Sequence, residues 1–292
     1  MISSAIKRVV LSGPFQVSFL GAFARRFIQS TRKLCGYSTK FMVDSQATQR
    51  PHYSYCLYNA AVLAKSLGLS RISALEFGVA GGNGLKYMID FSKEIAETLG
   101  VTIECYGFDT GKGMPEPDGP LDLPYWFQSG QYAMNQTALV PEGLLDRVVL
   151  GNVKETVTQF VKKHNPAPIG VMFGDLDYWS STRDSLKLFK SAKAHPENFM
   201  PRMFMYFDDI IGTEVEMYGP FNGQLAAIGE FNNDHPNMKI HLNQNLLQFT
   251  HIRSRFQIYY AHLFDHPSYS NFVGKSGQDR MEELLKYRQG EQ

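Results

Sequence analysis

The feature that most constrains the fold is an apolar run that ends in an acid and a glycine-rich turn. Residues 73–77 are rich in strand formers, and residues 85–91, beyond the turn, have helical spacing. This order of strand, turn and helix is typical of nucleotide-like cofactor sites, because glycines let the backbone approach a ligand and a helix N-terminus offers unpaired N–H groups. The alternative is a close-packed corner that binds nothing. The turn contains four glycines, Gly78, Gly81, Gly82 and Gly84.

The spacing of this turn distinguishes it from dinucleotide folds. With Glu76 two residues before the first glycine, it reads E-x-G-x-x-G-G-x-G instead of G-x-G-x-x-G. It resembles motif I of class I S-adenosylmethionine-dependent methyltransferases, whose loop wraps the methionine part of the cofactor. The resemblance implies that four residues of this stretch bind S-adenosylmethionine: Glu76, Gly78, Gly81 and Gly82.

Length, charge and cysteine content limit the class of protein. The 292 residues suffice for one large α/β domain with additions or for two small domains. A formal net charge of +1 argues against a nucleic-acid partner, which would require a basic excess. The three cysteines form no C-x-x-C pair, which suits a reducing compartment and predicts a cytoplasmic protein.

The N-terminal part of the chain is strongly basic. Residues 1–43 contain seven lysines and arginines and no acid, and the apolar stretch 15–24 among them is too short to span a bilayer. Three interpretations remain open: a helical extension packed on the domain, an interfacial helix making peripheral membrane contact, and a targeting peptide. We therefore divide the chain into a basic, helical N-terminal extension (1–49), a methyltransferase-like domain (50–270) and a polar C-terminal tail (271–292).

Apolar runs and helical patterns alternate through the central region. This alternation predicts βαβ units in an α/β, Rossmann-like fold with a mostly parallel sheet and helices on both faces. The last two strands are joined only by residues 243–255, which predicts a hairpin and an antiparallel final strand. The predicted strands are residues 73–77, 102–108, 148–150, 169–173, 203–207, 239–242 and 257–263.

Two polar residues follow strands on the cofactor side of the predicted sheet. Asp109 ends the second strand, where a carboxylate can accept from both ribose hydroxyls of a bound nucleoside. A helix cap or turn acid is the alternative for Asp109. Asn152 follows the third strand, where an amide can read the adenine edge. We predict that both residues bind the cofactor.

Acids also follow the fourth and fifth strands. Asp175 comes after residues 169–173, and the pair Asp208 and Asp209 comes after residues 203–207. Carboxyl ends of adjacent parallel strands meet at one edge of a sheet, so these carboxylates are expected to converge. Three unpaired carboxylates repel one another, and a divalent cation such as Mg²⁺ relieves the repulsion. Helix capping or pairing with Lys or Arg is the alternative.

Three ordered motifs resemble one methyltransferase type. The runs 106–116 (YGFDTGKGMPE) and 175–182 (DLDYWSST) and the pair Asp208–Asp209 resemble the macrocin O-methyltransferase (TylF-like) type of class I methyltransferase. The resemblance implies a seven-stranded sheet of order 3-2-1-4-5-7-6, S-adenosylmethionine as donor and Mg²⁺ held by Asp175 and the Asp208–Asp209 pair. It also implies that Asp175 is the catalytic base or orients the acceptor hydroxyl. Leu176 and Trp179 depart from the pattern and leave the acceptor open.

The function predicted from these residues is Mg²⁺-dependent O-methylation. Methyl transfer from a sulfonium needs alignment and an activated oxygen, and requires no protein nucleophile. The predicted partner is a hydroxylated small molecule or glycan, and a homo-oligomer is compatible with the sequence. A nicotinamide-dependent oxidoreductase and a non-catalytic cofactor-binding protein are the alternatives. Tyr125, Trp126 and Phe127 are candidates either for a substrate wall or for anchors of the long loop.

Overall fold

The computed structural model describes residues 19–274 together with residues 282 and 285. Residues 1–18 of the predicted N-terminal extension and most of the predicted C-terminal tail therefore lie outside the described residues. The division of the chain at residues 49 and 270 stays a prediction. Among the described residues, no helix combines the length and the apolar character that crossing a bilayer requires.

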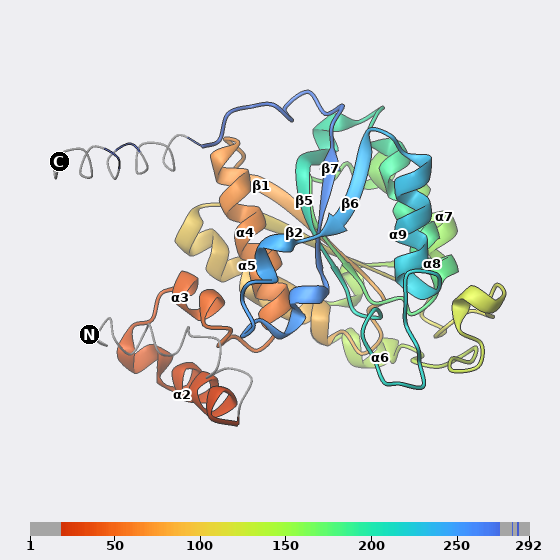
Figure 1. The fold of residues 1–292 in the computed structure, drawn as a ribbon, viewed down its shortest axis with the longest axis horizontal. Helices are drawn as coiled ribbons and strands as arrows, with labels where there is room; N and C mark the ends of the chain where they lie inside the picture. The colour runs from red at the N-terminus through yellow and green to blue at the C-terminus, as the bar shows by residue number, and fades with distance from the viewer. Residues whose placement is uncertain (1–18, 275–281, 283–284, 286–292) are drawn as a thin grey trace.

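A seven-stranded sheet built from the described residues runs through the centre of the molecule (Figure 1). Its order is β3-β2-β1-β4-β5-β7-β6; β1 to β5 are parallel, and β7 is antiparallel to both of its neighbours. The predicted fold class is confirmed, including the strand order and the antiparallel last strand. The strands are β1 (Arg71–Phe77), β2 (Thr102–Asp109), β3 (Val148–Leu150), β4 (Ile169–Gly174), β5 (Phe199–Phe207), β6 (Met238–Leu242) and β7 (Ile258–Leu263).

Helices cover both faces of the sheet, as Figure 1 shows. The helices α4 and α5 lie on one face, and α7, α8 and α9 lie on the other. Every residue of β4 is buried between these layers, which explains why that strand is apolar throughout. These helices are α4 (Pro51–Ser66), α5 (Asn83–Leu99), α7 (Val153–His164), α8 (Trp179–Ser185) and α9 (Gly223–Asp234).

The sequence predicts a helix over about residues 182–194 after β4, and the structure begins this helix earlier. Helix α8 already begins at Trp179, and the chain continues as the 3₁₀ helix η4 (Leu186–Ser191). The cause is a buried acid: Asp122 accepts hydrogen bonds from the backbone N–H and the hydroxyl of Ser180, which satisfies a donor of the first turn. The remaining short helices are α6 (Gln136–Leu139), η2 (Pro120–Asp122), η3 (Leu145–Arg147), η5 (Pro196–Asn198), η6 (Gln244–Leu246) and η7 (Arg253–Phe256).

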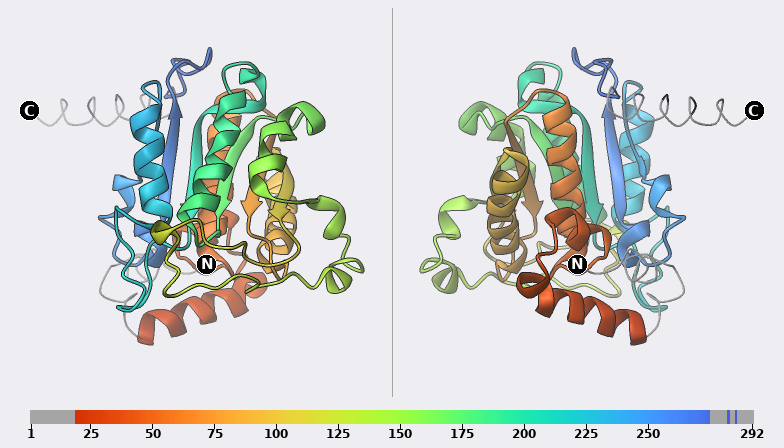
Figure 2. Two further views of the ribbon diagram at one scale, coloured as in Figure 1. Left: turned by 90° about the vertical axis from the view of Figure 1, so that its right-hand side faces the viewer. Right: turned by 90° about the vertical axis from the view of Figure 1, so that its left-hand side faces the viewer.

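Among the described residues, two helices precede α4 and pack beside α5. They are α2 (Phe19–Cys35) and α3 (Thr39–Asp44). Arg32 of α2 forms an ion pair with Glu94 of α5, and the Thr39 hydroxyl donates to the same carboxylate. Figure 2 places α2 at the end of the molecule to which the parallel strands point. The same end carries the loops that form the candidate site.

Candidate active site

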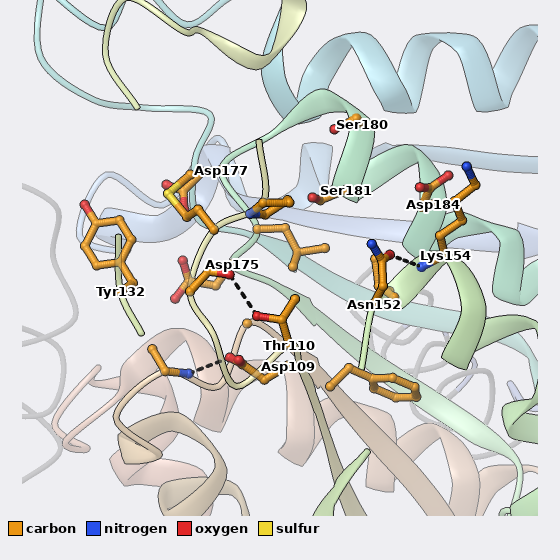
Figure 3. Close-up of a pocket in the computed structure, with 18 of the residues that line it drawn as sticks. Asp109, Thr110, Tyr132, Asn152, Lys154, Asp175, Asp177, Ser180, Ser181 and Asp184 are labelled. Carbon is orange, nitrogen blue, oxygen red and sulfur yellow. Dashed lines mark hydrogen bonds between the residues drawn. The ribbon is translucent and has the colours of Figure 1, made fainter. Parts of the chain in front are cut away.

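A cavity of about 500 Å³ opens at the carboxyl edge of the sheet (Figure 3). Its walls come from the segments that follow β1, β2, β3, β4 and β5. Because β1 and β4 are neighbours, while the chain leaves β1 toward β2 on the opposite side, the cavity lies at the switch point of the sheet, where open α/β sheets bind ligands. Six predicted site residues line it: Gly78, Asp109, Asn152, Asp175, Asp208 and Asp209.

The first residue of the glycine turn permits the close approach of two strands. Gly78 has φ +89°, and a Cβ there would lie 1.8 Å from the carbonyl oxygen of Asp175. Its N–H donates to the carbonyl of Phe108 on β2. No side chain fits at this position, so the turn places bare backbone against the cavity.

The other glycines shape the turn from behind. Gly82 is the N-cap of α5 with φ +76°, and a Cβ there would lie 2.5 Å from Leu139. Gly81 has an ordinary φ, and the nearest atom to its Cβ position is 3.7 Å away. Neither residue lines the cavity. A direct cofactor contact by Gly81 or Gly82 therefore stays a prediction, and their visible role is to direct the chain into α5.

Glu76 lies beneath the turn, outside the cavity lining. Its carboxyl group is buried; Oε1 accepts a hydrogen bond from the Tyr53 hydroxyl, and Oε2 has no partner among the described residues. Burial, supported by the negative charge of Asp175, raises the pKa of Glu76 to about 8. Gly84 makes room for this group, since a Cβ there would lie 1.7 Å from Oε1. A cofactor contact by Glu76 stays a prediction.

Asp109 connects β2 to the glycine turn. One carboxylate oxygen accepts from the N–H groups of Val79 and Ala80, both at 2.9 Å, and the other accepts from Gly111 N–H at 2.7 Å. A carboxylate oxygen has two lone pairs, so Oδ1 retains acceptor capacity toward the cavity. The predicted ribose contact is compatible with these bonds. The alternative of a turn acid is also met, because the same bonds hold the glycine turn in place.

Asn152 lies across the cavity from Asp175, as Figure 3 shows. It is the N-cap of α7, and its side-chain oxygen accepts from Lys154 N–H at 2.9 Å. The amide NH₂ group has no hydrogen-bond acceptor among the described residues, and Asn152 lines the cavity. The predicted contact with an adenine edge would use these amide donors.

Asp175, Asp208 and Asp209 converge, as their strand positions predict. One oxygen from each carboxylate lies within 4.8 Å of the others. The backbone holds them: Asp175 N–H donates to Phe77 O, and Asp208 N–H donates to Gly174 O, each at 2.9 Å. Asp209 N–H donates to the side chain of Gln224. In the described part of the chain, no Lys or Arg forms a salt bridge with these acids.

The cluster is electrostatically unfavourable without a cation. Desolvation of its carboxyl group, together with the charges of Asp209 and Asp208, raises the pKa of Asp175 to about 8. Burial and then the charge of Asp177 also raise the pKa of Asp209. Burial followed by the charge of Asp175 raises the pKa of Asp177 to about 7. Closely spaced acids with raised pKa values are a common feature of functional sites.

Two tyrosines contribute to the site without having been predicted from the sequence. The Tyr206 hydroxyl donates to Asp208, and its ring stacks on His52 with centroids 4.5 Å apart. Tyr132 lines the cavity, whereas the expected wall of Tyr125, Trp126 and Phe127 does not. Within that wall, Phe127 is buried and the Tyr125 hydroxyl donates to the Glu216 carbonyl, so these aromatic residues anchor the loop. The sequence places Tyr206 on a strand but does not show which group its hydroxyl bonds to.

Comparison with known proteins identifies the fold. No protein family model matches the sequence, and no curated protein has a matching sequence. The chain is similar in structure to CalS11, a calicheamicin methyltransferase, with a TM-score of 0.51 and 18% identity over 85% of this chain and 94% of that chain. It also resembles the O-methyltransferase NovP, with a TM-score of 0.49 and 16% identity over 73% of this chain and 80% of that one. The likeness to CalS11 shows the fold, which is a Rossmann-like methyltransferase fold.

Proposed function

We propose that the protein is an S-adenosylmethionine-dependent methyltransferase that methylates a hydroxyl group of a small molecule or glycan, with Mg²⁺ held by Asp175, Asp208 and Asp209. One observation carries the proposal. A single cavity has a side-chain-free turn at Gly78 on one side and three converging carboxylates on the other. The similarity in fold to CalS11, a calicheamicin methyltransferase, agrees with it.

The cofactor side of the cavity fits S-adenosylmethionine. When bound, this cofactor supplies a methyl group on a positively charged sulfur. The bare backbone at Gly78 admits the methionine part, Asp109 would accept from the ribose hydroxyls, and Asn152 would contact the adenine edge. Acids across the cavity favour a cationic donor over its neutral product.

The acid side of the cavity fits a divalent cation. Carboxylate oxygens are the ligands that Mg²⁺ prefers, and no Lys or Arg of the described residues forms a salt bridge with the cluster. A bound Mg²⁺ would lower the pKa of a chelating hydroxyl and fix its position. The Tyr206 hydroxyl would orient Asp208 from outside, as hydrogen-bond partners of metal ligands usually do.

Asp175 is the candidate proton acceptor. It lies where the turn and the acid cluster meet, because its backbone oxygen is the atom that excludes a Cβ at Gly78. As an ionised carboxylate it could take the proton of the acceptor hydroxyl or orient that hydroxyl.

Calorimetry separates this function from the alternatives. The full-length protein is titrated with S-adenosylmethionine, S-adenosylhomocysteine and NAD, each with and without Mg²⁺. We expect both sulfur compounds to bind and NAD to give no heat. Binding of NAD alone would indicate a nicotinamide-dependent oxidoreductase and would overturn the proposal.

A methyl-transfer screen then tests catalysis. Hydroxylated sugars, phenols and lipid-linked glycans are offered with labelled S-adenosylmethionine, and each positive acceptor is tested again in EDTA. We expect a hydroxylated acceptor whose methylation stops in EDTA and resumes with Mg²⁺. Cofactor binding without transfer to any acceptor would favour a non-catalytic binding protein, and full activity in EDTA would remove the metal from the proposal.

A further inference from the structure

Helix α2 has two faces of different character. The inward face contains Ile28, which is buried, and Arg32, which pairs with Glu94. The opposite face carries Phe23 and Phe27, which are 65% and 55% exposed, and continues to the exposed Leu34. Positions four residues apart share a face of a helix, so these side chains form one apolar stripe.

Positive charge borders this stripe. Arg26 and Lys33 lie on the same flank of the helix, two turns apart, and both are exposed. Residues 19–35 contain no Asp or Glu. An exposed aromatic stripe with basic residues on its flank is the composition of helices that lie in the interface of an anionic membrane.

A second segment repeats this composition beside α2. The segment 247–256 has exposed apolar side chains at Leu247, Phe249 and Phe256, and contains two arginines and no acid. Arg253 lies close enough to Arg25 of α2 for its charge, after burial, to lower the pKa of Arg25. The guanidinium of Arg255 lies over the Phe256 ring at 4.6 Å. Both elements therefore extend one apolar and basic surface.

This surface continues to the mouth of the candidate active site. The Gln257 side chain donates to the Asp208 carbonyl at 2.8 Å, which ties the segment 247–256 to the start of the loop 208–222. Figures 1 and 2 place this loop at the same end of the molecule as α2. The loop adds the exposed apolar side chains Ile211, Val215, Met217 and Phe221, and its charged residues are acids, including the exposed Glu214.

We propose that α2 and the segment 247–256 dock the protein on the surface of an anionic phospholipid bilayer. Neighbouring exposed apolar side chains mark interaction surfaces. Charge complementarity indicates the partner, because the basic groups on both elements match lipid phosphates. The docked helix lies in the plane of the interface with Phe23 and Phe27 inserted below the headgroups. The loop 208–222 then meets the same surface, so the cavity opens toward the lipid headgroups.

Docking itself does not rest on the proposed methyltransferase function. Its consequence for the acceptor does: a hydroxyl carried by a lipid or a lipid-linked glycan would be presented at the cavity mouth. Vesicle binding is therefore measured without cofactor or acceptor, so that a failure of docking and a failure of catalysis are separate results.

The test is co-sedimentation of the full-length protein with vesicles of phosphatidylcholine alone or of phosphatidylcholine with phosphatidylglycerol. We expect binding only to the anionic vesicles, and weaker binding at high salt. The double variant Phe23→Ser/Phe27→Ser should bind about tenfold more weakly or worse. The double variant Arg26→Gln/Lys33→Gln should lose about fivefold for each charge removed.

Phe272→Ser is the matched control. Phe272 is 64% exposed, similar to Phe23. It belongs to the segment that follows β7, and this segment leaves the sheet at the end of the molecule away from α2 (Figure 1). It should leave vesicle binding unchanged, and thermal unfolding checks that all variants are folded. Absence of binding, or equal binding by the Phe23→Ser/Phe27→Ser variant, would overturn the proposal. So would a dimer in sedimentation velocity that this variant dissociates, because the stripe would then be covered by a second copy of the chain.

Discussion

The two sides of the cavity differ in how their polar groups are satisfied. On the cofactor side, Asp109 accepts three backbone N–H groups, and Gly78 is fixed between β2 and β4. On the acid side, Asp175 and Asp209 have raised pKa values and no basic partner among the described residues. One side is complete as it stands, and the other needs a cation to be complete.

This difference indicates how each side would act. A rigid turn in which Gly78, Val79 and Ala80 already donate their N–H groups selects its ligand largely by shape, so substitutions there should affect cofactor binding and stability. A cluster of repelling carboxylates selects its ligand by charge, so substitutions there should affect metal binding and turnover. The predictions below test this separation, beginning with the largest expected effect.

The Gly78→Ala substitution should damage the cofactor side most. Its Cβ would lie 1.8 Å from the Asp175 carbonyl oxygen, and the residue has a positive φ. We expect a loss of about 2–4 kcal/mol in the free energy of unfolding and no detectable S-adenosylmethionine binding. Gly100→Ala is the control, because it has φ +72° with no atom within 4 Å of its Cβ position. It should cost about 1 kcal/mol and leave binding intact.

The Asp208→Asn and Asp109→Asn variants should fail in opposite ways. We expect Asp208→Asn to lower turnover about 100-fold or more while S-adenosylmethionine affinity is unchanged. Asp109→Asn should instead weaken S-adenosylmethionine affinity about tenfold, because it removes a charged acceptor at the turn. Calorimetry and a transfer assay measure both quantities. Parallel losses of affinity and turnover in both variants would show that the two sides do not act separately.

The Tyr206→Phe variant should weaken the acid side without removing a carboxylate. It deletes the hydroxyl that donates to Asp208, and we expect Mg²⁺ affinity to fall about tenfold. Tyr125→Phe deletes a comparable phenolic hydrogen bond, to the Glu216 carbonyl, and should leave Mg²⁺ affinity unchanged. The two dissociation constants are compared by isothermal titration. Equal Mg²⁺ affinity in Tyr206→Phe and the unmodified protein would contradict an orienting role.

Glu76 should give the smallest effect, which is a dependence of stability on pH. Its folded-state pKa of about 8 lies above the ordinary value of 4.5, so between these values the folded protein keeps a proton that the unfolded chain has released. Stability therefore falls as pH rises through this window, by at most about 1.4 kcal/mol per pH unit. Glu76→Gln cannot titrate and should show a shallower slope in urea unfolding. Identical slopes for the two proteins would contradict a protonated Glu76.

Local signals made the fold and the convergence of the acids predictable. The glycine turn, the apolar strands and the acids that end them are short-range patterns, and the geometry of parallel strands brings such ends to one edge. Asp122 and the position of Tyr132 were not predictable, because each depends on contacts between residues far apart in sequence. Tyr206 was not predictable because the strand pattern does not show that its hydroxyl donates to Asp208, two residues further on. Asp122 accepts a hydrogen bond from Ser180, which is 58 positions away in the sequence, and this contact accompanies the start of α8 at Trp179.

The most direct measurement is a crystal structure with S-adenosylhomocysteine and Mn²⁺, in which anomalous scattering locates the metal. The account predicts S-adenosylhomocysteine against the turn at Gly78, with its ribose at Asp109, and Mn²⁺ between Asp175, Asp208 and Asp209. A turn without ligand, or Mn²⁺ bound away from these three carboxylates, would contradict it.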